Sequence, residues 1–228
     1  VIFLIATIPI LLIYKITINK TYTYLSIGDD LAKGHTPFNT YGESYTDYLF
    51  TYLKTKNTNA EINKKYIDED MRITDLIKSL KNIEENSLTQ DIKKSDIITI
   101  SIGSDELFSK LRSTYNIKNT YTKYADEMLN DLSNLLTEIR KINKKEIYII
   151  GYYSPIKETE ENKDYLEGLF GYITMKFQKI EETYKVKYIK IDDAFKNNYT
   201  YLPNQNNAFP SIDGYKYIAN QIIKEISS

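Results

Sequence analysis

Acidic side chains follow the ends of apolar runs at three places in this sequence. Asp30 lies in "YLSIGDDLAKG", Asp105 lies in "ISIGSDEL", and Asp70 follows the run "AEINKKYI". In open α/β sheets, ligands bind beyond the carboxyl ends of parallel strands. If these runs are such strands, the three carboxylates converge there, and carboxylates are the ligands that Ca²⁺ and Mg²⁺ prefer. The sequence therefore predicts an acidic site at three strand ends, with a divalent cation or a cationic ligand as its occupant.

Two further acids adjoin this predicted site. Asp29 directly precedes Asp30, and Glu106 directly follows Asp105. Two-carboxylate, metal-assisted hydrolysis is one use of such a cluster. The alternative is that Asp29 caps local backbone while the other carboxylates point apart or into water. The sequence leaves both interpretations open.

Short apolar runs alternate with longer amphipathic patterns, which predicts strands followed by helices. The expected strands cover 21–27, 60–67, 96–102, 146–153 and 186–191. The expected helices cover 45–53, 73–80, 117–142, 164–184 and 211–226. Alternation of this kind indicates right-handed crossovers and a parallel sheet covered on both faces. The predicted fold is a three-layer α/β/α sandwich with a five-stranded parallel sheet, and its ligand-facing loops are 28–35, 68–72, 103–106, 151–157 and 195–210.

Composition limits the classes of function. The 228 residues suit one domain, which we place at 21–228. Thirty basic residues against 31 acidic ones give a net charge of −1, so the chain offers no field that attracts nucleic acid. Cysteine is absent, which excludes disulfides, thiolate metal sites and a cysteine nucleophile.

The first fourteen residues, "VIFLIATIPILLIY", carry no charge before Lys15. This run is shorter than the roughly 20 residues of a complete spanning helix. Residues 1–20 are predicted to be a membrane anchor or the remnant of a signal anchor, which makes the membrane a partner. No small-residue cleavage site follows, which favours an uncleaved anchor. The alternative is a buried segment of the core.

Four segments resemble, in order, the sequence blocks of the SGNH (GDSL) hydrolase family. "SIGDDLAKG" resembles the first block, "DMRITDLI" the second, "ISIGSDEL" the third, and "FPSIDGYKYIA" the fifth. The resemblance spans about 200 residues, from the first predicted strand to the last helix. It implies the flavodoxin-like fold of that family, with esterase-type hydrolysis at the strand ends.

The residues that carry the family's chemistry are all replaced. The resemblance places Asp30 at the serine nucleophile, Asp70 at the second-block glycine and Asp105 at the third-block asparagine. Asn206 stands at the acidic partner and Phe209 at the histidine. A benzene ring accepts no proton, and an ionised carboxylate donates no hydrogen bond to an oxyanion. No catalytic residue is assigned, and loss of serine-esterase activity is expected.

Other candidate ligand contacts are aromatic. Tyr152 and Tyr153 follow the fourth predicted strand, and Tyr199 and Tyr201 lie in a polar loop; such rings stack on sugars or on partner side chains. His35 is the only histidine, and its loop suggests no clear path back to the nucleophile position.

We therefore predict a membrane-anchored, extracytoplasmic SGNH-hydrolase-like domain that serves as a binding or scaffolding module. Its expected ligand is a carbohydrate, another envelope component or a protein, and no cofactor is required. The alternative function is an active cell-envelope esterase or deacetylase that works through the acidic cluster and a metal. A third interpretation is a structural partner whose helices, rather than its cleft, form the interface.

Overall fold

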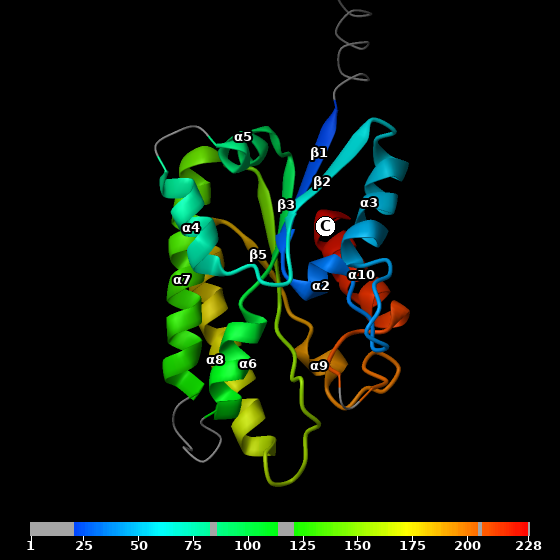
Figure 1. Ribbon diagram of the computed structural model, residues 1–228, viewed down its shortest axis with the longest axis vertical. Coiled ribbons are helices and arrows are strands. Elements are labelled where there is room, and N and C mark those ends of the chain that lie inside the picture. Colours follow the sequence, from blue (N-terminus) through cyan, green and yellow to red (C-terminus); the bar gives the residue numbers. More distant parts are fainter. Residues whose placement is uncertain (1–20, 83–85, 114–120, 205–206, 228) are drawn as a thin grey trace, which may run out of the picture.

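A parallel sheet lies between two layers of helices in the computed structural model, which describes residues 21–82, 86–113, 121–204 and 207–227 (Figure 1). The five strands run in the order β2-β1-β3-β4-β5, all of them parallel. The strands are β1 (Tyr22–Gly28), β2 (Ala60–Ile67), β3 (Ile97–Ser101), β4 (Glu146–Ile150) and β5 (Lys187–Ile189). The predicted three-layer sandwich and its five strands are confirmed. Chain order reverses between β1 and β3, which is where ligands bind in such sheets.

The helices divide between the two faces of the sheet. One face carries α4 (Ile73–Lys81), α5 (Ser87–Lys94), α6 (Ser104–Ser113), α7 (Tyr121–Ile142) and α8 (Lys163–Tyr184). The other carries α2 (Asp30–Lys33), α3 (Tyr45–Lys56), α9 (Asp192–Phe195) and α10 (Ile212–Ser227).

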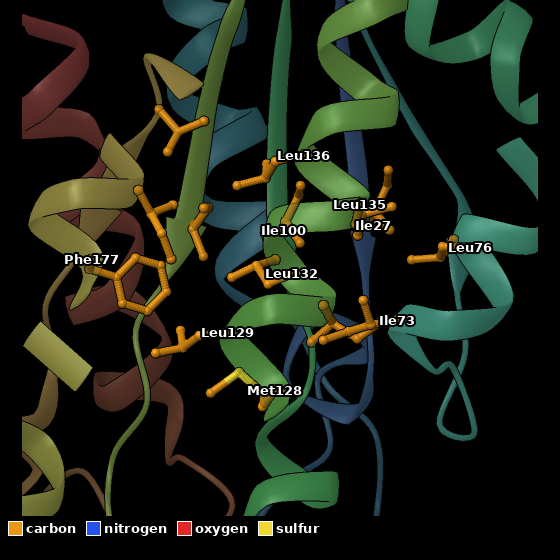
Figure 2. Packing of buried hydrophobic residues seen from close by; sticks show 14 of the residues in the cluster. Ile27, Ile73, Leu76, Ile100, Met128, Leu129, Leu132, Leu135, Leu136 and Phe177 are labelled. Atoms are coloured by element: carbon orange, nitrogen blue, oxygen red, sulfur yellow. The ribbon is translucent and has the colours of Figure 1, made fainter. Parts of the chain in front are cut away.

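The central strand β3 supplies side chains to both cores. Ile98 and Ile100 belong to the core beneath α7 and α8, while Ile97 belongs to the core beneath α3 and α10. Alternate residues of a strand point to opposite faces, so every residue of a strand covered on both sides is buried, as in β3. Figure 2 shows Leu132 and Leu136 of α7 packed beside Ile100.

Several elements differ from the sequence expectation. The segment 103–106, expected as a loop, contains the start of α6, and α2 occupies part of the expected loop 28–35. Short helices such as α5 and α9 present too few turns for a periodic apolar face, so periodicity does not reveal them. β4 ends at Ile150, three residues before the predicted end, and the N–H of Gly151 donates to Ile189 O at 2.9 Å.

Two glycines bring the carboxyl ends of β1 and β3 close together. A Cβ on Gly28 would lie 2.5 Å from Ser101 Oγ and 2.6 Å from Ser101 O. Gly103 has φ +93°, a left-handed conformation that turns the chain from β3 directly into α6. These glycines therefore place the acidic residues after both strands at one edge of the sheet.

The predicted anchor, residues 1–20, lies outside the described residues. From Thr21 onward, no helix that the structure describes is long and apolar enough to cross a membrane.

Candidate functional site

Asp29 is held in place by the turn that joins β1 to α2. Its N–H donates to Ser101 O at 3.0 Å, and its carboxylate accepts the N–H of Leu31 at 3.3 Å as the N-cap of α2. The hydroxyl of Ser104 donates to the other carboxylate oxygen at 3.4 Å. The side chain is thus a cap, the role that aspartate fills at helix starts.

The ionisation of Asp29 is strongly perturbed by its surroundings. The residue is 4% exposed, and burial together with the carboxylate of Asp105 raises its pKa to about 7. Hydrogen bonding from the N–H of Leu31 opposes this rise. Asp29 therefore binds a proton over much of the range in which an ordinary aspartate is ionised.

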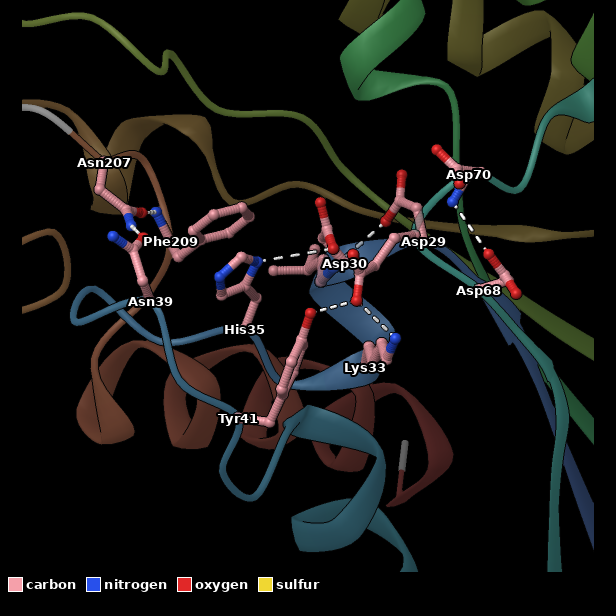
Figure 3. Close-up of polar contacts among 12 residues, drawn as sticks. Asp29, Asp30, Lys33, His35, Asn39, Tyr41, Asp68, Asp70, Asn207 and Phe209 are labelled. Carbon is pink, nitrogen blue, oxygen red and sulfur yellow. Dashed lines mark hydrogen bonds and ion pairs between the residues drawn. The ribbon is translucent and has the colours of Figure 1, made fainter.

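Asp30 begins α2 and faces the only histidine. Its Oδ1 lies 3.6 Å from Nδ1 of His35, and neither buried atom makes a hydrogen bond within the described chain (Figure 3). Burial and Asp105 raise the pKa of Asp30, and His35 opposes the increase. The expectation that His35 has no path back to this position is wrong, because the α2 turn brings its imidazole beside Asp30.

The ring of Phe209 stacks on His35 rather than standing alone before Asp30. Their ring centroids are 3.9 Å apart with planes inclined by 21°. The imidazole thus contacts both the residue at the nucleophile position and the residue at the histidine position. The fifth block, in which Phe209 stands at the histidine position, gives no indication of this stacking, because His35 lies near the first block of the chain.

Beside His35 lies a polar group centred on Glu69, which no sequence motif singles out. Glu69 accepts hydrogen bonds from Lys33 Nζ at 2.5 Å and from the hydroxyl of Tyr41. The ring of Tyr41 lies 5.0 Å from that of His35, and Lys33 Nζ lies 4.9 Å from the Tyr41 ring. Figure 3 shows Lys33 and Tyr41 near His35 and Asp30.

Asp70 does not join the other predicted acids. Its side chain is exposed, and its N–H donates to Oδ1 of Asp68 at 3.0 Å. Asp30 and Asp105 line one cavity to which Asp70 does not contribute. Across the described residues, no group of three or more histidine or acidic side chains is arranged to hold a metal ion.

The cavity has a volume of about 430 Å³ and opens at the ends of β1, β3 and β4. Its carboxylates come from Asp29, Asp30 and Asp105, and its described lining contains no lysine or arginine. Aromatic walls are supplied by Phe108, Tyr152, Tyr153 and Phe209. The size falls within the range of small-molecule sites, about 300–1,000 Å³.

The four predicted tyrosines have different positions. Tyr152 donates to Ile102 O at 3.0 Å and Tyr153 donates to Ala208 O at 2.7 Å, so these two present ring surfaces to the cavity. Tyr199 lines a neighbouring cavity, and Tyr201 packs against Phe195. Asn206 lies outside the described residues.

Hydrogen bonds join the loop after α2 to the loop before α10. Asn207 Nδ2 donates to Asn39 Oδ1 at 2.7 Å, and Asn204 Nδ2 donates to Pro37 O at 2.8 Å. Both asparagines of the second loop line the cavity, so these bonds set the width of its mouth.

A parallel 2-1-3-4-5 sheet with its site at the β1/β3 switch point defines a flavodoxin-like α/β domain. The sequence profile of the GDSL-like lipase/acylhydrolase family matches residues 24–222. The chain belongs to this family. No curated protein sequence matches it.

Solved structures show the same fold at low sequence identity. The lipase Lip_vut3 from a goat rumen metagenome is 16% identical with a TM-score of 0.73, over 89% of this chain and 96% of that one. The acetylxylan esterase Axe2 of Geobacillus stearothermophilus is 20% identical with a TM-score of 0.64, over 91% and 94%. A putative GDSL-like lipase of Parabacteroides merdae is 16% identical with a TM-score of 0.64, over 89% and 94%.

Proposed function

We propose that this GDSL-family domain binds an amine-bearing sugar at its acidic cavity and does not carry out serine-type ester hydrolysis. The observation that carries the proposal is the cavity lining, which holds three carboxylates and no lysine or arginine among its described residues. A ligand that brings positive charge and hydrogen-bond donors relieves the repulsion between these acids. The aromatic walls offer ring faces against which a sugar packs.

The nucleophile and the oxyanion donors that serine-type acyl transfer needs are not found among the described residues at this edge of the sheet. Attack by Asp30 on an ester would form an anhydride, which then needs a directed water to break down. The tetrahedral oxyanion also needs preorganised donors, whereas Asp105 offers acceptors when ionised. The N–H of Asp70, at the second-block position, is not free to act as such a donor, because it already donates to the carboxylate of Asp68.

Binding is tested with glucosamine as the probe, by isothermal titration calorimetry at pH 7.5. Wild-type protein is expected to bind it, and Asp30→Asn is expected to weaken binding about tenfold by removing one charge. Asp75→Asn, on the exposed side of α4, is the matched control and leaves binding unchanged. Absence of binding by wild-type protein would refute the proposed function.

A second candidate function is favoured by the 3.6 Å approach of Asp30 to His35. A carboxylate beside an imidazole is an arrangement that orients a base toward water, so direct hydrolysis by a cell-envelope esterase or deacetylase is the alternative. Turnover of p-nitrophenyl acetate by wild-type protein, lost in His35→Ala and in Asp30→Ala, would establish it. No turnover, with or without 5 mM Ca²⁺ or Mg²⁺, would eliminate it.

A cation bound by Asp30 and Asp105 is the metal-assisted form of this alternative. Both residues line the cavity, and carboxylate oxygens suit Ca²⁺ and Mg²⁺. Thermal stabilisation by millimolar Ca²⁺ that disappears in Asp105→Asn would support it, and an unchanged melting temperature would remove it.

Restoring the family residues tests whether the scaffold lacks only its chemistry. The combined variant is Asp30→Ser, Asp70→Gly, Asp105→Asn, Asn206→Asp and Phe209→His. The proposal expects esterase turnover to rise above that of the wild type. Circular dichroism establishes beforehand that this variant folds.

We further propose that residues 1–20 anchor the domain to a membrane with the cavity outside the cytoplasm. The support is the uncharged apolar run of fourteen residues before Lys15. Sedimentation of the full chain with membranes after a carbonate wash tests the anchor. Protease accessibility in intact cells against lysed cells tests the orientation.

A further inference from the structure

A second cavity adjoins the acidic one along the same edge of the sheet. It has a volume of about 390 Å³ and lies between the segment after β4, the helix α8 and the segment from β5 to α9. Pro155, Asn204 and Ala208 line both cavities. A ligand that extends past these three residues therefore passes from one cavity into the other.

Two buried polar atoms of this second cavity lack partners. Oδ1 of Asp192 and Oγ1 of Thr174 make no hydrogen bond within the described chain. The other carboxylate oxygen of Asp192 lies 3.1 Å from Lys190 Nζ, so only one of the two is satisfied. Buried polar atoms in folded proteins nearly always have partners. These two atoms suit a ligand that carries hydroxyl groups.

A glycine on α8 leaves open space at the lining of this cavity. Gly171 lies in the middle of the helix, where glycine is less favourable than alanine. A Cβ added there would meet nothing within 4 Å, so no packing contact requires the small residue. Gly171 also lines the cavity, and its missing side chain is space that a ligand can use.

The charges of the second cavity are more nearly balanced than those of the first, with three lysines and four acids in its described lining. Lys196 Nζ lies 2.9 Å from Glu158 and 3.0 Å from Glu167. Lys190 is paired with Asp192, and Lys157 Nζ lies 5.9 Å from the centre of the Tyr199 ring, so the lining does not strongly oppose a sugar unit with an amine. The rings of Phe170 and Tyr199 in its lining are suited to the apolar face of a sugar.

We propose that the second cavity is a subsite for a further sugar unit of an oligosaccharide whose amine-bearing unit lies in the acidic cavity. This inference rests on the proposed function and extends it from a monosaccharide to a chain. Linked units share one loss of translational freedom, so the chain binds more tightly than its separate units.

The experiment compares glucosamine with the β-1,4-linked tetramer of glucosamine by calorimetry on the full chain. The tetramer is expected to bind at least about tenfold more tightly than the monomer. Gly171→Leu fills the second cavity and is expected to remove this gain while leaving glucosamine affinity unchanged. Gln178→Leu introduces the same side chain on an exposed turn of α8 that lines neither cavity, and keeps the gain.

A conservative pair of variants tests the same subsite without filling it. Thr174→Val removes the buried hydroxyl and is expected to lower tetramer affinity about threefold, roughly one neutral hydrogen bond at its weaker end. Thr51→Val, on the exposed part of α3, is the matched control and has no effect.

The outcomes separate the subsite from the proposed function. Equal affinities for monomer and tetramer, or a tetramer affinity unchanged in both Gly171→Leu and Thr174→Val, would overturn the subsite and leave monosaccharide binding intact. Loss of the gain in Gln178→Leu as well would assign the effect to the helix and overturn the subsite. No binding of either sugar would overturn the proposed function and the subsite together.

Discussion

The two adjoining cavities differ in how their charges are balanced. The lining of the first contains Asp29, Asp30 and Asp105 but no lysine or arginine among the described residues. In the second, Lys190 and Lys196 are both paired with acids. Carboxylates that face one another repel and hold protons more tightly. In the second cavity burial raises the pKa of Asp192, but Lys190 opposes that increase. The difference teaches that the first cavity carries an electrostatic cost that a purely structural role does not require.

A mutation in the wall between the two cavities is expected to have the largest effect on stability. Phe195 is buried, lines the second cavity, and stacks on Tyr153 of the first at 4.7 Å between ring centroids. Phe195→Ala is expected to lower the free energy of unfolding by about 3–5 kcal/mol, since it leaves a large void. Urea denaturation measures this, with the exposed Phe38→Ala as control. A loss below about 1 kcal/mol would show that the wall is not a packed structure.

The buried acid of the first cavity is expected to make stability depend on pH. The pKa of Asp29 is raised from 3.8 to about 7 in the folded state. The folded state then binds more protons than the unfolded state between these values, so stability falls as pH rises from about 4 to about 7. At about 1.4 kcal/mol per unit, the contribution is on the order of 4 kcal/mol.

Asp29→Asn isolates this contribution because asparagine is also a good N-cap. The difference in unfolding free energy between wild type and variant is expected to be small near pH 4 and to favour the variant at pH 8. Urea denaturation at several pH values measures it. A difference that does not vary with pH would contradict the raised pKa.

Removing one repelling charge is expected to give a smaller effect. Asp105→Asn takes away a carboxylate that raises the pKa of both Asp29 and Asp30. We expect a gain of about 1 kcal/mol at pH 8 relative to pH 4, because repulsion exists only when the partners are ionised. Equal effects at both values would place Asp105 too far away to matter.

The smallest expected effect concerns the second cavity. Gly171→Ala adds a methyl group in open space on α8, and is expected to stabilise the fold by about 0.5–1 kcal/mol through helix propensity. Thermal denaturation measures the gain. A destabilised variant would mean that the position is crowded.

Much of the fold follows from sequence pattern. β3 is buried throughout because both of its faces are covered, and the helices α7 and α8 are long enough to show their period. The sequence pattern does not predict α5 and α9, because these helices are too short to show a period. In physical terms, periodicity reports long elements with one buried face and little else.

The site is less predictable than the fold. Linear spacing brings Asp30 and Asp105 to one cavity, because parallel strand ends share an edge. It does not reveal that Asp70 faces elsewhere or that His35 reaches Asp30, because loop conformation decides both. The sequence also does not reveal Tyr41 and Glu69. A single antiparallel bridge to His35 positions Tyr41, and Tyr41 in turn donates a hydrogen bond to Glu69.

The mouth of the acidic cavity is built from distant parts of the chain. Tyr215 donates to His35 O at 2.7 Å across 180 positions, and Asn207 donates to Asn39 across 168. Contacts of such long range form late, after the closure entropy of the intervening chain has been overcome. During synthesis from the N-terminus, the segment around His35 therefore waits for α10 to be made, and the acidic cavity is complete only when nearly all of the domain has been made.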